Sequence, residues 1–269
     1  MEQQSESRQE RVVVALDASP NSRATLRAAV QLALQLQAEL EGLFIEDDNL
    51  LRLCNLPFGQ EVGLFSATAR RLESGAVERE LRVMARSLQQ ALASLAEPMQ
   101  VPWSFRVARG RVAEELLSAA EQAQLLSLGY CGRAPGSAVG AASEVILRRS
   151  TRPVLVLGQN DTQPSTFTLI DHPSLSGERA LEFGLRLAQR TGQALQIVVP
   201  RPGDEDPITR LAWLRAELAR RNIPARIIQG SSTATLARQL SELPTGTLIL
   251  PAEFADLLHQ VRNSVIVVP

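Results

Sequence analysis

The sequence predicts an α/β fold of two tandem domains, each a doubly wound parallel sheet with helices on both faces. Short β-branched or leucine-rich runs alternate with amphipathic helical segments along the chain. The order of these segments in residues 11–158 recurs in residues 166–269, and an internal repeat of this kind indicates two similar units. Apolar residues make up 45% of the chain and aromatic residues 4%, a composition that suits helices packed on sheets.

The first predicted domain, residues 11–158, reads as five strands with helices between them. The predicted strands are RVVVAL (11–16), AELEGLFI (38–45), SFRVA (104–108), LLSLGY (125–130) and PVLVLG (153–158). The predicted helices are RATLRAAVQLALQLQ (23–37), RVAEELLSAAEQA (111–123) and SEVILRRS (143–150). After the first strand, Asp17 closes the run, and Ser19 or Asn21 is placed to cap the following helix.

A long insertion, about residues 46–102, separates the second and third strands of this domain. Its apolar residues recur at helical spacing and predict one helix over residues 66–97, roughly 30 residues and about 45 Å long. These residues are Leu72, Val77, Leu81, Met84, Leu88, Leu92 and Leu95. A helix of this length exceeds what one small domain requires, so we expect the insertion to contact a neighbouring domain or a protein partner.

The second predicted domain, residues 166–269, follows a polar linker at residues 159–165. Its predicted strands are TFTLID (166–171), QALQIVVP (193–200), ARIIQG (225–230), TLILP (247–251) and SVIVVP (264–269). Its predicted helices span residues 176–191, 206–221 and 232–243. No glycine lies between Leu248 and the final strand, so this half lacks a glycine loop and is expected to be structural.

The segment RVVVALDASPNS, with the Ala-rich helix and AELEGLFIED after it, resembles the opening of the universal stress protein family. The end of the first half is also similar to that family: a strand, a Gly-x-x-Gly loop, a short helix and the strand PVLVLG. The resemblance implies strand order 3-2-1-4-5 in each half. It also implies antiparallel pairing between the two last strands, 153–158 and 264–269, which would make the chain a pseudo-dimer.

The resemblance further implies an adenine nucleotide, such as ATP, ADP or AMP, between the loops that follow strands one and four. The candidate ligand residues are Asp17, Ser19, Gly129, Gly132, Gly140 and Ser143. Small residues there let backbone amides approach phosphates at a helix N-terminus. The loop departs from the family pattern, because only seven residues separate Gly132 from Gly140 and Ala141 stands where the family has Ser or Thr.

Each candidate also has a structural alternative. The glycines fit a tight strand-to-helix turn, and Asp17 fits a helix N-cap as well as an adenine contact. Asp171, the second-half counterpart of Asp17, is expected to cap a helix. The only histidines, His172 and His259, lack metal-ligand spacing, and surface roles are expected for both. Cys54 is expected to pack in the core, whereas Cys131 is expected to be a packing residue or a redox-sensitive thiol.

Net charge, the length of apolar runs and the motifs present exclude several classes of function. Net charge is −1 and the isoelectric point about 6.2, so no nucleic-acid partner is expected. No run reaches membrane-spanning length, and the polar first ten residues lack a signal core, so a cytoplasmic protein is expected. No catalytic signature is present, so no enzyme is expected. Two hypotheses remain: a non-enzymatic nucleotide-binding stress protein, or a nucleotide-free interaction protein that uses residues 46–102. Assembly into a homodimer stays open.

Overall fold

A computed structural model describes residues 10–17, 22–54, 60–62, 69–71, 74–129, 141–158, 166–200, 207–230, 236, 238–240, 242 and 246–269. The strands are β1 (Arg11–Leu16), β2 (Glu39–Asp47), β3 (Gln60–Val62), β4 (Ala69–Arg71), β5 (Trp103–Gly110), β6 (Leu125–Leu128), β7 (Val154–Val156), β8 (Thr166–Ile170), β9 (Ala194–Val199), β10 (Ala225–Gln229), β11 (Thr247–Pro251) and β12 (Ser264–Val268). The helices are α1 (Ser22–Leu36), α2 (Asp48–Cys54), α3 (Ser74–Ala96), η1 (Glu97–Met99), α4 (Val112–Gln122), α5 (Ala141–Arg149), α6 (Leu175–Thr191), α7 (Pro207–Arg220) and η2 (Ala252–Gln260).

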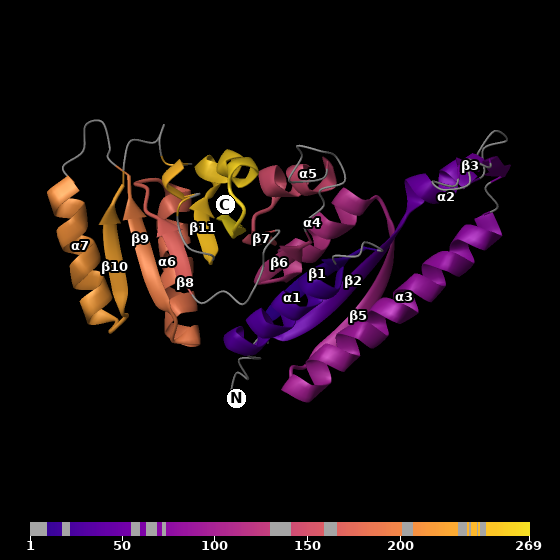
Figure 1. Cartoon of the computed structure of the whole chain (residues 1–269), viewed down its shortest axis with the longest axis horizontal. Coiled ribbons are helices and arrows are strands. Elements are labelled where there is room, and N and C mark those ends of the chain that lie inside the picture. The colour runs from indigo at the N-terminus through magenta and orange to yellow at the C-terminus, as the bar shows by residue number, and fades with distance from the viewer. Residues whose placement is uncertain are drawn as a thin grey trace, which may run out of the picture.

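Ten strands form one continuous sheet that runs through both halves of the chain (Figure 1). Their order is β10-β9-β8-β11-β12-β7-β6-β1-β2-β5. Each half has the predicted order 3-2-1-4-5, with β5-β2-β1-β6-β7 from the first and β10-β9-β8-β11-β12 from the second. Within this ten-stranded sheet all neighbours from the same half are parallel, and β7 and β12 pair antiparallel. The fold class and the pairing of the last strands are therefore as predicted.

The joint between the two halves is tightly packed. In its register Leu155 lies opposite Ile266, with Val154 and Val156 opposite Val267 and Val265. Leu155 is 4% and Ile266 1% exposed.

Just past the joint the chain passes so close to the other half that only glycine fits. A Cβ on Gly158 would lie 2.3 Å from the carbonyl oxygen of Arg262, and the Gly158 amide donates to Ser264 Oγ at 3.0 Å. Because that close contact is with backbone, no side-chain movement would relieve it.

Two apolar layers cover the faces of this sheet. Alternation along the strands sends Val12, Val14 and Leu16 to one face of β1 and Val13 to the other. Helices α1, α3, α6 and α7 pack on the first face, while α4, α5 and η2 pack on the second. Strands buried on both faces read as continuous apolar runs, which explains why the strand segments are recognisable in the sequence.

The long segment between β2 and β5 differs from its prediction. Helix α3 begins at Ser74 rather than near residue 66, and residues 69–71 form strand β4, so the predicted 30-residue helix is too long at its N-terminal end. Helix α3 connects the parallel strands β2 and β5, which require a crossover of this kind. Most of the predicted insertion is therefore the ordinary crossover connection, and the additional part is α2 with the β3–β4 hairpin.

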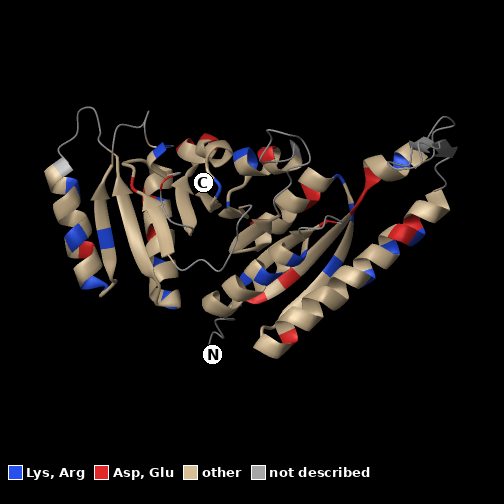
Figure 2. Cartoon of the chain, in the orientation of Figure 1, with Lys and Arg blue, Asp and Glu red and all other residues tan. Residues whose placement is uncertain are grey.

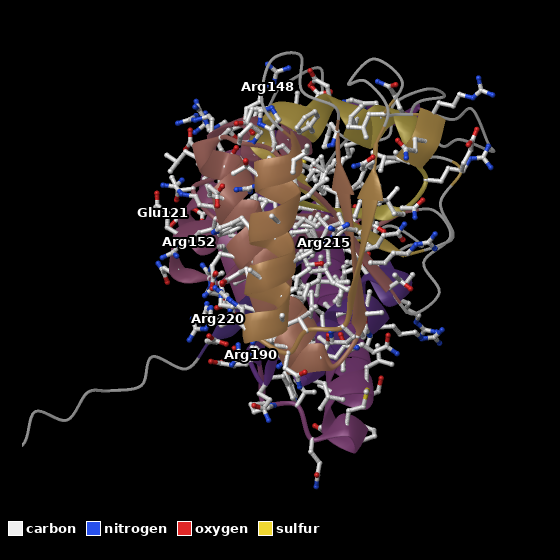
Figure 3. The ribbon with its side chains drawn as sticks, turned by 90° about the vertical axis from the view of Figure 1, so that its left-hand side faces the viewer. Glu121, Arg148, Arg152, Arg190, Arg215 and Arg220 are labelled. Carbon is white, nitrogen blue, oxygen red and sulfur yellow. The ribbon has the colours of Figure 1, made fainter. Side chains whose placement is uncertain are left out.

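Charged residues concentrate on helices and along the β2–β5 side of the sheet, whereas the strands in its middle carry few (Figure 2). Glu41 on β2 is buried, and its two oxygens accept from Arg106 Nε at 2.7 Å and Arg11 Nη1 at 3.0 Å. β5 is an edge strand of the sheet, and arginines on such an edge discourage pairing with another chain. The arginines labelled in Figure 3, which looks onto α7, are spread over the surface rather than gathered at one spot.

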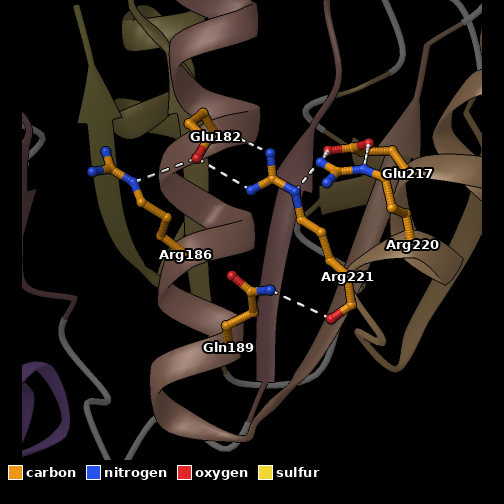
Figure 4. A network of polar contacts seen from close by, with 6 residues as sticks. All are labelled: Glu182, Arg186, Gln189, Glu217, Arg220 and Arg221. Atoms are coloured by element: carbon orange, nitrogen blue, oxygen red, sulfur yellow. Dashed lines mark hydrogen bonds and ion pairs between the residues drawn. The ribbon is translucent and has the colours of Figure 1, made fainter.

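A network of ion pairs fastens α7 to α6 (Figure 4). Arg221, just after α7, donates to both oxygens of Glu182 on α6, at 3.1 and 2.7 Å, and to Glu217 at 2.6 Å. Arg220 makes two further bonds to Glu217, at 2.8 and 2.6 Å. The hydrogen bonds from Arg220 and Arg221 lower the pKa of Glu217 from its ordinary value of 4.5 to about 2.

We expect this network to make stability depend on acid pH. The folded-state pKa of Glu217 lies below its unfolded value, so its contribution is complete above pH 4.5 and disappears as pH falls toward 2. The variant Glu217→Gln should therefore lose less thermal stability than the native protein between pH 4.5 and 2.5, as measured by melting temperature. The exposed Glu80→Gln on α3 is the control, and identical pH profiles for both variants would contradict the prediction.

Candidate functional site

The candidate site lies between two strands of the first half whose onward connections lead to opposite sides of the sheet. β1 and β6 are parallel neighbours, with β2 on the far side of β1 and β7 on the far side of β6. At such a switch point the loops at the carboxyl ends diverge and leave a crevice, where doubly wound sheets bind ligands. Asp17 follows β1 and Gly129 follows β6, so both lie at this crevice.

A cavity of about 270 Å³ occupies the crevice. Its polar lining comes from the ends of strands and the beginnings of helices, and its apolar lining comes from strands β1, β2 and β6 and from helices α2, α3, α4 and α5. The described lining residues are Ala15, Leu16, Asp17, Thr25, Leu43, Phe44, Ile45, Asp47, Leu50, Leu81, Met84, Val112, Leu116, Leu128, Gly129, Ala142 and Ser143. The only charged groups among them are the carboxylates of Asp17 and Asp47.

Asp17 combines an exposed carboxylate with a contact to the first helix. The hydroxyl of Ser22, the first residue of α1, donates to the Asp17 carbonyl at 2.5 Å and to Oδ1 at 2.9 Å. These bonds hold the beginning of α1 against the end of β1. The carboxylate still lines the cavity, so helix fastening and ligand contact are compatible roles for Asp17.

Gly129, just after β6, packs closely against the side chain of Thr25 on α1. A Cβ at this position would lie 2.9 Å from Thr25 Oγ1, and Thr25 is buried in the first turns of α1. Ser143 lies in the first turn of α5, is 6% exposed and faces the same cavity. The structure thus brings together three of the predicted site residues, Asp17, Gly129 and Ser143.

The other three predicted site residues, Ser19, Gly132 and Gly140, lie outside the described residues, as does Cys131. The predicted linker at 159–165 lies outside them too. Cys54 is buried, as predicted for a packing residue, and its thiol donates to Leu50 O at 3.1 Å.

Sequence reasoning did not assign the apolar wall of the cavity to the site. Leu81 and Met84 were recognisable as part of a helical stripe, and Asp47 as a residue near the end of a strand. Their position at the cavity depends on how α3 crosses over β2, which short-range patterns do not encode. Leu50 belongs to α2, and its place over the cavity follows only from the three-dimensional arrangement.

In the second half, Asp171 is not the predicted helix cap. Ser174 is the N-cap of α6, and its Oγ accepts from the Gly177 amide at 3.0 Å. Asp171 is buried instead and receives two hydrogen bonds from Arg210 of α7. An ion pair with a residue on a distant helix has no local sequence pattern. An aspartate just before a helix, by contrast, suggests an N-cap.

The prediction for His172 also needs correction. Its ring packs edge-on against Phe254, with centroids 5.1 Å apart, and Nδ1 is buried with no hydrogen-bond partner among the described residues. His172 is therefore half-buried rather than a surface residue, because η2 folds over it. His259 is exposed, as expected.

Two absences hold for the described residues. No group of three or more His, Cys, Asp or Glu side chains in this part of the chain is arranged to hold a metal ion. None of the helices described has both the length and the apolar character needed to cross a membrane.

Comparison with known proteins gives a consistent family assignment. A model described as "Universal stress protein family" matches residues 9–158. A universal stress protein from Archaeoglobus fulgidus superposes with a TM-score of 0.73 at 16% identity, covering 97% of both chains. A functionally unknown protein from Pseudomonas aeruginosa superposes at 0.60 and 14% identity, covering 97% of this chain and 92% of that one. At these identities the superpositions establish the fold alone. Curated protein sequences gave no match.

Proposed function

Because the family match spans more than half of the chain, the protein belongs to the universal stress protein family, and on this premise we propose that it is a non-enzymatic stress-response protein whose N-terminal half binds an adenine nucleotide. The observation that carries this proposal is the cavity at the β1–β6 switch point, lined by Asp17, Gly129 and Ser143. Its volume of about 270 Å³ is close to the lower end of typical ligand pockets, about 300 Å³.

The lining of the cavity suits a purine base and a sugar. Phe44, Ile45 and Met84 supply apolar surface for a flat heterocycle. The Asp17 carboxylate accepts hydrogen bonds, which suits an exocyclic amino group or a ribose hydroxyl. The hydroxyl of Ser143 both donates and accepts, and its burial favours a bonded partner.

The phosphates in this proposal lie toward the beginnings of helices. Thr25 belongs to the first turns of α1, and Ala142 and Ser143 to the first turn of α5, and all three line the cavity. Backbone amides at a helix N-terminus, together with the helix dipole, attract anions. The glycine loop from Gly129 to Gly140 would supply further amides, as the family pattern implies.

No catalytic step is included in the proposal. Within the described lining, Ser143 and Thr25 carry hydroxyl groups, while both histidines belong to the second half of the chain. An activated hydroxyl nucleophile requires a base within hydrogen-bond reach, and no histidine is among the described lining residues to serve as that base.

The first experiment is to denature freshly purified protein and analyse the released small molecules by mass spectrometry. A stoichiometric adenine nucleotide supports the proposal. If none is released, titration with ATP, ADP and AMP by calorimetry decides the matter, and absence of heat and of thermal stabilisation at millimolar ligand would overturn it.

The variant Asp17→Ala should weaken nucleotide binding at least about tenfold, which corresponds to about 1.4 kcal/mol. The reason is the loss of a carboxylate acceptor at the cavity, together with looser attachment of Ser22 at the start of α1. Calorimetric Kd values for the native protein and the variant test this. Asp256→Ala, an exposed aspartate in η2, is the control and should leave Kd unchanged. Equal Kd values for both variants would show that Asp17 does not contribute to nucleotide binding.

A second candidate function is a nucleotide-free interaction protein that contacts its partner through the segment after β2. Three large apolar side chains there are well exposed: Leu53 at 53%, Leu50 at 37% and Val83 at 66%. Exposed apolar residues on adjacent helices suit a protein contact. A blank result for nucleotides, with loss of partner capture in Leu53→Asp, would favour this candidate.

A further inference from the structure

The second half contains a counterpart of the candidate site. Asp171 follows β8 as Asp17 follows β1, and β8 lies beside β11 as β1 lies beside β6. Both aspartates therefore lie at a switch point of the same topology. Their surroundings differ, because Asp17 is exposed beside a cavity while the side chain of Asp171 is only 2% exposed.

Arg210 occupies both oxygens of Asp171. Its Nε donates to Oδ2 at 2.8 Å and its Nη2 to Oδ1 at 2.5 Å, the paired geometry that a planar guanidinium makes with a carboxylate. The third nitrogen, Nη1, donates to Glu178 at 2.7 Å. The ring of Trp213 lies 4.8 Å from the guanidinium carbon. All three nitrogens thus have a carboxylate partner, and an aromatic face covers the cation.

The helix that carries Arg210 has a counterpart in the first half. Helix α7 connects β9 to β10 as α3 connects β2 to β5. Both helices end in the same way: Gln100 and Asn222 have positive φ, and the amides of Val101 and Ile223 donate to the carbonyls of Ala96 and Leu218. This register places Leu88 of α3 opposite Arg210 of α7.

Leu88 and Arg210 therefore occupy the same position of equivalent helices. Leu88 packs against the apolar core of the first half, whereas Arg210 reaches Asp171. At this position the first half has an apolar residue and the second half has a cation.

We propose that the second switch-point site is a guanidinium site occupied by the chain's own Arg210, so that one chain offers one open ligand site although its fold contains two. A buried carboxylate needs a charged, hydrogen-bonded partner, and Arg210 fulfils this need permanently. The hydrogen bond with Asp171 raises the pKa of Arg210 still further above its ordinary value, so the guanidinium stays charged. The filled site does not rest on nucleotide binding by the first half.

The test is chemical rescue in the full chain. The variant Arg210→Ala should lower the melting temperature by roughly 5–10 °C, because it leaves Asp171 buried and unpaired. Low-millimolar methylguanidinium should recover part of this loss, since it restores the two-pronged donor. Methylammonium, which has the charge without the planar fork, should recover less. The exposed Arg215→Ala on the same helix is the matched control and should melt like the native protein, with no response to methylguanidinium.

The double variant Asp171→Asn with Arg210→Ala separates site occupation from general salt effects, and it should show no rescue. A melting temperature for Arg210→Ala within about one degree of the native value, or equal effects of methylguanidinium on the single and double variants, overturns the proposal. If Arg210→Ala does not fold, Arg210→Lys replaces it, with an intermediate melting temperature expected and a native-like one excluding the site. None of these readouts uses a nucleotide, so failure here is distinct from failure of the nucleotide proposal.

Discussion

The variant Ile266→Asp is expected to lose about 3–5 kcal/mol of unfolding free energy, because it places an unpaired carboxylate in a buried position. Ile266 lies in the middle of the β7–β12 joint, opposite Leu155, and is 1% exposed. It also belongs to the apolar layer that α1 and α6 cover, so no nearby solvent is available to the charge. Loss of the Ile266 side chain therefore weakens the packing between the two halves as well as the core.

Urea unfolding followed by circular dichroism measures this effect. Ile208→Asp makes the same chemical change on an isoleucine that is 73% exposed on α7, and it should change stability by less than about 0.5 kcal/mol. Ile266→Leu, which keeps the volume, should cost less than about 1.5 kcal/mol. A loss below 1 kcal/mol for Ile266→Asp would mean that the joint does not form in solution.

Leu92→Ala is expected to cost about 2–5 kcal/mol by opening a cavity between α3 and the sheet. Leu92 is completely buried, and its Cδ2 would lie 2.8 Å from a Cβ on Gly42 of β2. Gly42 thus leaves the space that Leu92 fills, with Phe105 of β5 beside it. The contact is what positions α3 over β2, so the variant should also weaken ligand binding through the displaced Leu81 and Met84.

The same denaturation experiment tests this prediction. Leu175→Ala is its control, since Leu175 is 71% exposed at the start of α6 and should change stability by less than about 0.5 kcal/mol. Equal losses for the two variants would show that α3 does not pack on β2 as described.

Much of the fold is predictable from the sequence because its signals are local. The runs Val12–Val14 and Val265–Val268 are buried on both faces, and continuous apolar runs of this length identify central strands. The beginning of α3 was not predictable in the same way. Leu72 continues the helical stripe, yet β4 ends at Arg71 and the helix starts only at Ser74, since pairing with β3 takes precedence over the periodicity.

The site was predictable only in part. Asp17 and Gly129 follow apolar strands directly, so their meeting at one edge of the sheet follows from parallel pairing. The role of Met84 and the ion pair of Asp171 with Arg210 depend on the placement of crossover helices. Residues 39 positions apart in the chain make that ion pair, and no periodic pattern connects them.

The antiparallel joint has a consequence for how the two halves diverge. Leu155 and Ile266 are equivalent residues of the repeat and face each other, so a local twofold axis passes between them. In a symmetric pair of identical subunits every substitution occurs on both sides of such an axis. Here both sides belong to one chain, and each side is free to change alone. A single polypeptide can therefore keep matched strands at the axis while leucine occupies a position on one crossover helix and arginine the equivalent position on the other.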